Sequence, residues 1–385
     1  DRFDEAYDAF RKANQPKETL KLLQRLGFNS VIEHRFKDAS YYFLRYSLEV
    51  LSVAKVFDEL TEEAREHFAS FAKFYQLAKL YYAYHFIHQY SELPFTSMEP
   101  KYLFNIARYL LMNTATTDTP YSISKVNTVY AMAKLGQLLG NYKLAREAFQ
   151  KLQTLRIPKH LKTEVELQNI LVNSKPMTNN DELVPVCYRC SSNNPFLSAT
   201  GDYCQSCGHP FIRSFYSFNI LPLVEFELDD DITEDDAIML IQSDTTKKSS
   251  SGSGGVNSST SNGGGWRMTN DEDENVQTLS FDDHPSTSFV PSSSSQDPFR
   301  QALMNSKTAK VKVNRQILSA LPREEVFVIN WGVPLMKSKF YRNMVPSTPI
   351  VLCHYCNMFF HEEDYEFEAL KNKGCPFCSH PPQSE

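Results

Sequence analysis

Residues 187–207 read CYRCSSNNPFLSATGDYCQSC, with one Cys-x-x-Cys pair at each end. Residues 353–378 begin and end in the same way, and the two stretches hold all eight cysteines of the 385-residue chain. Two such pairs can turn four sulfurs toward one point, which completes the tetrahedral shell that Zn²⁺ prefers. The intervals of 13 and 18 residues between the pairs fit known zinc-binding spacings. The sequence therefore predicts two structural zinc ions, one held by Cys187, Cys190, Cys204 and Cys207, the other by Cys353, Cys356, Cys375 and Cys378.

The pattern fits four alternatives less well. No stretch resembles the apolar core of a secretory signal, so disulfides are not indicated, and a redox motif needs one pair rather than four. Four thiolates leave no open position for a catalytic water. A cross-braced RING-type domain, in which alternate pairs share a metal, needs a further Cys/His pair in the middle, whereas His361 stands alone between the last two pairs.

Bulk composition argues against a membrane-spanning protein and makes a nucleic-acid-binding zinc ribbon the minority interpretation. The net charge of −6 and the 42% of hydrophobic residues are typical of a water-soluble protein, and no apolar run reaches the ~20 residues of a membrane helix. An acidic chain also lacks the electrostatic basis for nucleic-acid binding. The basic run at 307–315 alternates with Ala309, Val311 and Val313, which favours a half-exposed strand. Because the chain begins at Asp1 without a methionine, we expect an excerpt of a longer protein.

Residues 1 to about 175 show helical periodicity, and a repeat lies within them. Phe3, Ala6 and Phe10 recur 33 residues later as Phe36, Ala39 and Phe43, close to the 34-residue tetratricopeptide period. Gly140-x-Tyr142-x-x-Ala145-x-x-x-Phe149, followed by Pro158, matches the second-helix part of that pattern. The middle, from Leu60 to Tyr90, predicts longer helices. The fold class expected is mainly α, a tetratricopeptide-like solenoid followed by two zinc-ribbon-like modules.

A solenoid presents extended surfaces to other proteins, and the chain contains no metalloprotease, nucleophile-elbow or phosphate-loop motif. Binding rather than catalysis is therefore the expected activity. The aromatic residues of the helices are interpreted as packing core rather than as a ligand pocket.

The segments after the helices divide by composition. Residues 211–218 and 220–228 look strand-like. Asp229 to Asp236 has the odd-position carboxylates of a calcium loop, but Glu234 and Leu240 replace its glycine and glutamate, so Thr233 is interpreted as a helix cap.

Ser/Gly-rich composition predicts disorder between the modules. The predicted domains are a solenoid at 1–177, a first zinc module at 178–242, a linker at 243–297 and a second zinc module at 298–385.

Several strings of residues together resemble one known family. They are Glu182-Leu183-Val184-Pro185-x-Cys187-Tyr188-Arg189-Cys190, Leu223-Val224-Glu225-Phe226, Trp331, Pro334-Leu335, Cys353-x-x-Cys356-x-Met358-Phe359, Glu363-Asp364-Tyr365-Glu366 and Cys375-Pro376-x-Cys378, with Asp1-Arg2-Phe3, Ala39-x-Tyr41-Tyr42 and Ser122 to Val126 in the helices. They are similar to the C-terminal portion of the intraflagellar transport protein 122 homologs. The Ser/Gly tract does not match, and the paired N-terminal β-propellers of these WD-repeat proteins have no counterpart here.

The resemblance implies a non-enzymatic scaffold subunit of intraflagellar transport complex A. Such a subunit would support retrograde ciliary transport and the ciliary entry of membrane-protein cargo. It would contact the other complex A subunits and, indirectly, cargo and the retrograde motor, at the cilium, the ciliary base and in the cytoplasm. The rival interpretation is a vesicle coat or tethering subunit whose zinc-binding end acts like a ubiquitin ligase.

Overall fold

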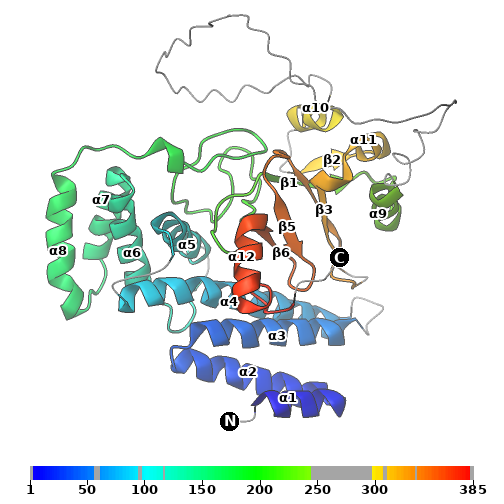
Figure 1. Cartoon of the computed structure of the whole chain (residues 1–385), viewed down its shortest axis with the longest axis horizontal. Helices are drawn as coiled ribbons and strands as arrows, with labels where there is room; N and C mark the ends of the chain where they lie inside the picture. The colour runs from blue at the N-terminus through cyan, green and yellow to red at the C-terminus, as the bar shows by residue number, and fades with distance from the viewer. Residues whose placement is uncertain are drawn as a thin grey trace, which may run out of the picture.

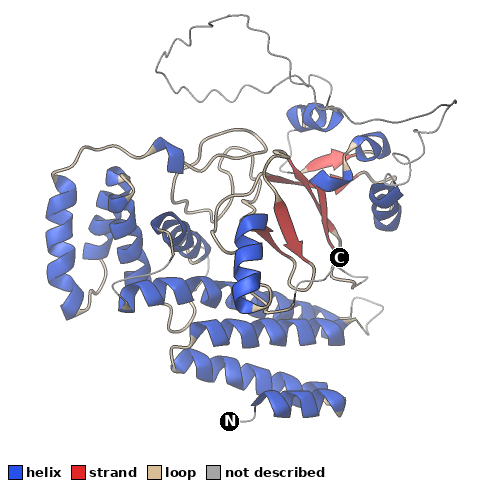
Figure 2. Cartoon of the chain, viewed as in Figure 1, coloured by secondary structure: helices blue, strands red, loops and turns tan. Residues whose placement is uncertain are grey.

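The computed structural model describes residues 3–55, 61–93, 98–115, 118–243, 297–306, 310–333 and 336–381. Its N-terminal part is a stack of helices, as predicted, and the strands gather in the C-terminal half (Figures 1 and 2). The stacked helices are α1 Phe3–Lys12, α2 Pro16–Ile32, α3 Phe36–Ala54, α4 Glu62–Glu92, α5 Pro100–Asn113, α6 Lys125–Leu138, α7 Tyr142–Gln153 and α8 Lys159–Asn173. The mainly α fold with a tetratricopeptide-like solenoid is confirmed.

The repeated Phe-Ala-Phe pattern builds the centre of this stack. Phe36, Ala39 and Phe43 are at most 1% exposed on α3, where they face both neighbouring helices. A Cβ on Gly27 of α2 would lie 2.6 Å from the Phe43 ring, so only glycine allows this approach. On the other side the Phe43 ring stacks on Tyr81 of α4 at 5.6 Å. The 31-residue α4 is the longer helix that the middle section predicted, and Thr61 caps it by accepting a hydrogen bond from the backbone N–H of Ala64.

The C-terminal half contains two sheets. The larger has the strand order β2-β1-β4-β3, in which β1 and β2 are parallel and the other pairs antiparallel. The smaller is a β5–β6 hairpin that carries Cys353. The elements are η1 Asp181–Leu183, β1 Leu223–Leu228, α9 Glu234–Ser243, α10 Pro298–Asn305, β2 Val311–Val313, α11 Arg315–Ala320, η2 Arg323–Glu325, β3 Val326–Ile329, β4 Lys339–Asn343, β5 Ile350–Cys353, β6 Met358–His361 and α12 Glu362–Asn372.

The larger sheet joins the two segments that were predicted as separate zinc modules. Phe226 of β1 is in register with Val311 of β2 and Phe340 of β4. These residues share one core with α9, α10 and α11. The predicted domain limits therefore stay a prediction about the sequence. In the structure, strands from both sides of the predicted linker form one sheet.

The second cysteine cluster also packs directly on the helices. Cys353, Cys356, Cys375 and Cys378 belong to the same hydrophobic core as the aromatic residues of α3, α4 and α5. The Tyr75 hydroxyl of α4 donates a 2.7 Å hydrogen bond to the carbonyl of Cys356, and the Tyr82 ring meets Phe377 edge-on at 5.2 Å. In Figure 1, α12 overlaps α4, and Tyr82 of α4 and Glu368 of α12 line the same cavity.

Several local predictions have clear outcomes. Residues 211–218 are wrong as a strand, because a tight turn interrupts them, and the next strand begins at Leu223 rather than at 220. The Thr233 cap is confirmed, since its Oγ1 accepts from the Asp236 N–H at 3.2 Å. The basic run does contain a half-exposed strand, β2, in which Lys312 alone is exposed.

Two predictions concern membranes and the linker. Across the described ranges, no helix combines the length and apolar character needed to span a bilayer. Of the linker predicted at 243–297, residues 244–296 lie outside the described residues.

Candidate metal centres

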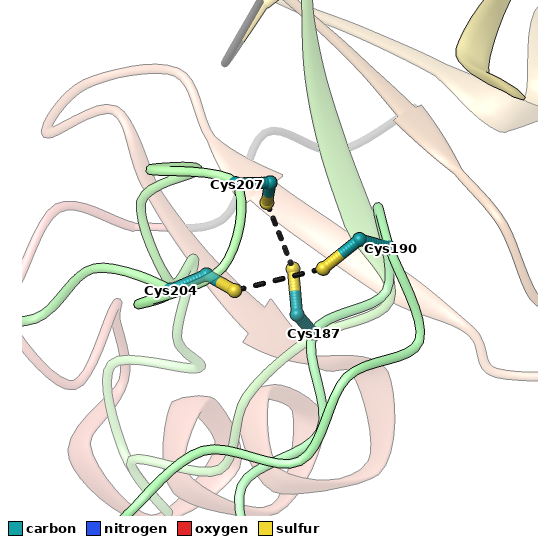
Figure 3. Close-up of side chains that lie close together, drawn as sticks. All are labelled: Cys187, Cys190, Cys204 and Cys207. Carbon is teal, nitrogen blue, oxygen red and sulfur yellow. Dashed lines mark hydrogen bonds between the residues drawn. The ribbon is translucent and has the colours of Figure 1, made fainter. Parts of the chain in front are cut away.

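The first cluster brings together four sulfurs from two turns. The ligand atoms of Cys187, Cys190, Cys204 and Cys207 all lie within 4.8 Å of one another, and Figure 3 shows the sulfurs converging on one point. The Sγ–Sγ distances are 3.7 Å between Cys187 and Cys207 and 3.6 Å between Cys190 and Cys204. Cys187 and Cys204 are buried, Cys207 is half-buried and Cys190 is exposed.

The second cluster has the same geometry in a deeper place. Its sulfurs also lie within 4.8 Å of one another, with distances of 3.7 Å from Cys353 to Cys378 and 3.9 Å from Cys356 to Cys375. All four cysteines are buried. A Cβ at Gly374 would lie 2.7 Å from the carbonyl oxygen of Ser379. Any side chain at the residue before Cys375 would therefore clash with this turn.

The four Cys-x-x-Cys turns share one backbone conformation. In each, the N–H four residues after the first cysteine donates to that cysteine's carbonyl at 2.7–2.9 Å. The donor residue has a positive φ every time: Ser191 at 55°, Gly208 at 72°, Asn357 at 53° and Ser379 at 56°. Glycine and asparagine accept this left-handed conformation at lower cost than most residues, whereas serine occupies it in the other two turns. The turns therefore arrange the sulfurs through local backbone hydrogen bonds.

These distances discriminate among the possible chemistries. A disulfide requires sulfurs about 2.05 Å apart, whereas every cysteine here is free. Four thiolates at about 2.3 Å from a central Zn²⁺ lie about 3.8 Å from one another, close to the 3.6–3.9 Å between two sulfur pairs in each cluster, and all sulfurs of a cluster lie within 4.8 Å of one another. Consecutive pairs share each cluster, which contradicts the cross-braced alternative. The donor set thus fits zinc with a closed shell.

The ionisation of the thiols also suits a dication. Burial raises the pKa of Cys187, Cys207 and Cys356, because loss of contact with water disfavours the charged thiolate. At Cys204 burial acts in the same direction, but hydrogen bonds from Ser192, the backbone and Asn194 outweigh it and lower the pKa to about 6. A bound dication would offset the remaining charge.

A further turn of the same shape contains no cysteine. The Ser214 N–H donates to the carbonyl of Asn219 and the Phe218 N–H to that of Ser214, both at 3.0 Å, as the N–H groups of Cys204 and Gly208 do in their turn. Phe218 has a φ of 53°, and Arg213 bridges Ile220 as Tyr203 bridges Pro210. Ser214 and Ser217, both 0% exposed, occupy the positions of the two cysteines. We call residues 213–220 the serine knuckle.

An ion pair stabilises the serine knuckle without a metal. Arg213 donates to both carboxylate oxygens of Asp202 at 2.6 Å and to the Phe218 carbonyl at 2.9 Å. The two side chains are only 4% and 13% exposed. Because this ion pair is bidentate and largely shielded from water, it fixes the position of the serine knuckle relative to Asp202.

Comparison with known proteins agrees with this geometry. A family model described as "IFT122, TPR domain" matches residues 1–127, and another described as "IFT122, zinc ribbon domain" matches residues 180–224. The intraflagellar transport protein 122 homolog of Danio rerio is 40% identical over 99% of this chain. The homologs of Mus musculus and Homo sapiens are 38% and 36% identical over 98% of it. The chain is similar along nearly its whole length to intraflagellar transport protein 122 homologs.

The resemblance predicted from the cysteine-containing strings is thus confirmed. The chain spans 30% of the length of the Danio rerio and Mus musculus relatives and 29% of the Homo sapiens one. The zinc-ribbon model of this family extends to residue 224, and it therefore includes the serine knuckle as well as the first cluster. The second cluster lies outside both matched models, within the stretch that the relatives cover.

Sequence reasoning placed all eight cysteines in two groups of four, and the structure brings these same groups together. It missed the serine knuckle. The one available signal was the Ser-x-x-Ser spacing at 214–217, ten residues after Cys204-x-x-Cys207. Ser-x-x-Ser is too common in sequences to suggest a zinc-type turn, since serine lacks the metal chemistry that makes cysteine spacing informative.

Proposed function

We propose that this chain is the solenoid and zinc-ribbon part of a non-enzymatic scaffold subunit of intraflagellar transport complex A. In this role it supports retrograde ciliary transport and the ciliary entry of membrane-protein cargo. Its partners are other subunits of complex A, through which it acts on cargo and on the retrograde motor. It works at the cilium, at the ciliary base and in the cytoplasm.

One observation carries this proposal, namely similarity to intraflagellar transport proteins along 99% of the chain. The architecture is consistent with it, because a helical solenoid presents broad surfaces for protein partners. Both cysteine clusters have four thiolates and no open coordination position, so a bound metal would contribute folding energy rather than catalysis.

We further propose that each cluster binds one zinc ion through its four cysteines. The support is the match between the sulfur distances and a tetrahedral shell. Zinc in sites of this kind contributes on the order of 10 kcal/mol to folding. The ions then stabilise the turns that lie against the helices.

The test is recovery of the complex from ciliated cells that express the chain with an affinity tag. We expect stoichiometric co-purification of complex A subunits and enrichment of the tagged chain at cilia. The matched control is Ala145→Arg, which disrupts the packing of α7. Absence of complex A subunits from the wild-type eluate would contradict the proposal.

The rival class, a ubiquitin-ligase-like coat or tethering subunit, is tested in parallel by a ubiquitin-discharge assay on the purified chain. We expect no discharge from a charged conjugating enzyme above the level without the chain. A RING-type domain would have cross-braced pairs, whereas the pairing observed here is sequential. Discharge that depends on the cysteine clusters would overturn the scaffold assignment.

A further inference from the structure

Helix α8 has apolar residues on two opposite faces. Val165 and Val172 face the stack and are 2% and 0% exposed. Leu167, Ile170 and Leu171 lie at i, i+3 and i+4 on the other side and are 55%, 67% and 44% exposed. Residues at this spacing form one continuous surface on a helix, which we call the α8 outer face.

The position of α8 makes this surface significant. It is the last helix of the stack and lies at one end of the molecule, with α6 and α7 on its inner side (Figure 1). Terminal helices of solenoids normally present a polar outer face, since nothing stacks on them. The outer face of α8 instead carries aliphatic residues at the i, i+3 and i+4 spacing that is typical of a helix packed against another helix.

The charge around this end indicates what kind of helix fits. The whole chain has a net charge of −6, yet over residues 142–178, all of which the structure describes, exposed basic residues outnumber exposed acidic ones. They are Lys143, Lys151, Arg156, Lys159, Lys162 and Lys175, against Glu147 and Glu166. Several of these cations lie at the N-terminal end of α8, where the helix dipole adds positive potential. A partner with acidic residues beside an apolar stripe would complement both features.

We propose that the α8 outer face docks an acidic amphipathic helix of another protein, so that the solenoid continues across a subunit boundary. The inference deepens the proposed function, on which it rests for the identity of that protein as a complex A subunit. A second copy of this chain fits less well, because two α8 faces would bring like charges together. A membrane surface also fits less well, since the stripe lacks aromatic residues and carries Glu166 beside it.

In the experiment, the photoreactive residue p-benzoylphenylalanine replaces Leu167 in the protein expressed in ciliated cells. After illumination, the assembled complex is isolated. We expect a cross-link to a helical segment of another subunit that carries net negative charge. The double variant Leu167→Asp/Ile170→Asp should lose co-purification of that subunit, and Lys159→Glu/Lys162→Glu should reduce it. Met239→Asp, at a 68% exposed methionine of α9, is the matched control and should retain it.

Four outcomes would overturn the inference. They are a cross-link to a second copy of this chain, cross-linking to no protein, retained co-purification by the double variant, and wild-type binding to phosphatidylcholine–phosphatidylserine vesicles that the double variant loses. If the wild-type protein recovers complex A and the double variant still co-purifies the same subunit, only the docking proposal fails and the proposed function stands. If the wild-type protein recovers no complex A subunit, the proposed function fails and the inference fails with it. Circular dichroism of each variant should match the wild type, because the altered side chains are exposed.

Discussion

The backbone N–H of Phe215 donates a 2.8 Å hydrogen bond to the carbonyl of Phe359. Phe215 lies in the serine knuckle, next to the first cysteine cluster, and Phe359 lies on β6, next to the second. The His361 N–H reinforces the contact by donating to Ser214 Oγ at 3.3 Å. The two candidate zinc sites, far apart in the sequence, are thereby connected through a turn that contains no cysteine.

This connection predicts that the serine knuckle stabilises the second cluster. The Phe215 ring packs on Tyr82 at 5.3 Å and on Phe377 at 4.7 Å, so Phe215→Ala would leave a cavity between all three. We expect a loss of about 3–5 kcal/mol in unfolding free energy and faster zinc release from the second cluster. Thermal melting and metal release to a chromogenic chelator measure the two effects. Tyr203→Ala, at a 51% exposed side chain, should change neither; an unaltered second cluster in Phe215→Ala would contradict the connection.

Metal stoichiometry gives a second prediction. The purified chain should contain two zinc ions, and Cys190→Ser should contain one, because each cluster closes within itself. Elemental analysis by mass spectrometry counts the ions. Cys190 is exposed whereas the whole second cluster is buried, so a chelator should remove the first ion faster. Loss of both metals from Cys190→Ser would show that the sites are not independently closed.

Chelation should loosen α4 but leave α7 and α8 unchanged. The second cluster shares its core with Tyr75 and Tyr82 of α4, whereas the buried residues of α8, and those of α7 other than Leu144, lie in a separate core. Removal of zinc takes away the folding energy of the turns that cover α4, so the amides of α4 should exchange faster with deuterium. Hydrogen-exchange mass spectrometry resolves the helices. Equal acceleration in α7 would mean that the helical stack unfolds as one unit.

The fourth prediction tests the tetratricopeptide-like packing of α6 and α7. Ala145 is fully buried, and a Cβ on Gly136 of α6 would lie 3.6 Å from the Ala145 Cβ. Ala145→Arg would place a charge and a long side chain where two helices nearly touch. We expect a loss of about 4 kcal/mol or more, measured by denaturant unfolding, with both metals retained. Glu147→Arg, at an exposed neighbouring position, is the control, and an unchanged midpoint for Ala145→Arg would disprove the assignment of this helix pair.

Much of the candidate site could be read from local spacing. Two cysteines with two residues between them bring their sulfurs together within one turn, so the grouping into two sets of four needed no knowledge of distant contacts. The helices were predictable for the same reason, since Phe36, Ala39 and Phe43 repeat with the helical period along one face. The serine knuckle escaped because its shape depends on backbone hydrogen bonds and on the Arg213–Asp202 pair rather than on a recognisable ligand.

The sequence by itself determined the family resemblance, the helical stack and the membership of each cysteine cluster, because each depends on residues close together in the chain or on a recognisable string. Only the tertiary structure decided that Phe226 pairs with Val311 in one sheet, that Tyr75 binds the Cys356 carbonyl, and that the α8 outer face remains exposed. Such contacts join residues whose separation in the sequence has no period, and they form because segments far apart in the chain bury their apolar surfaces together.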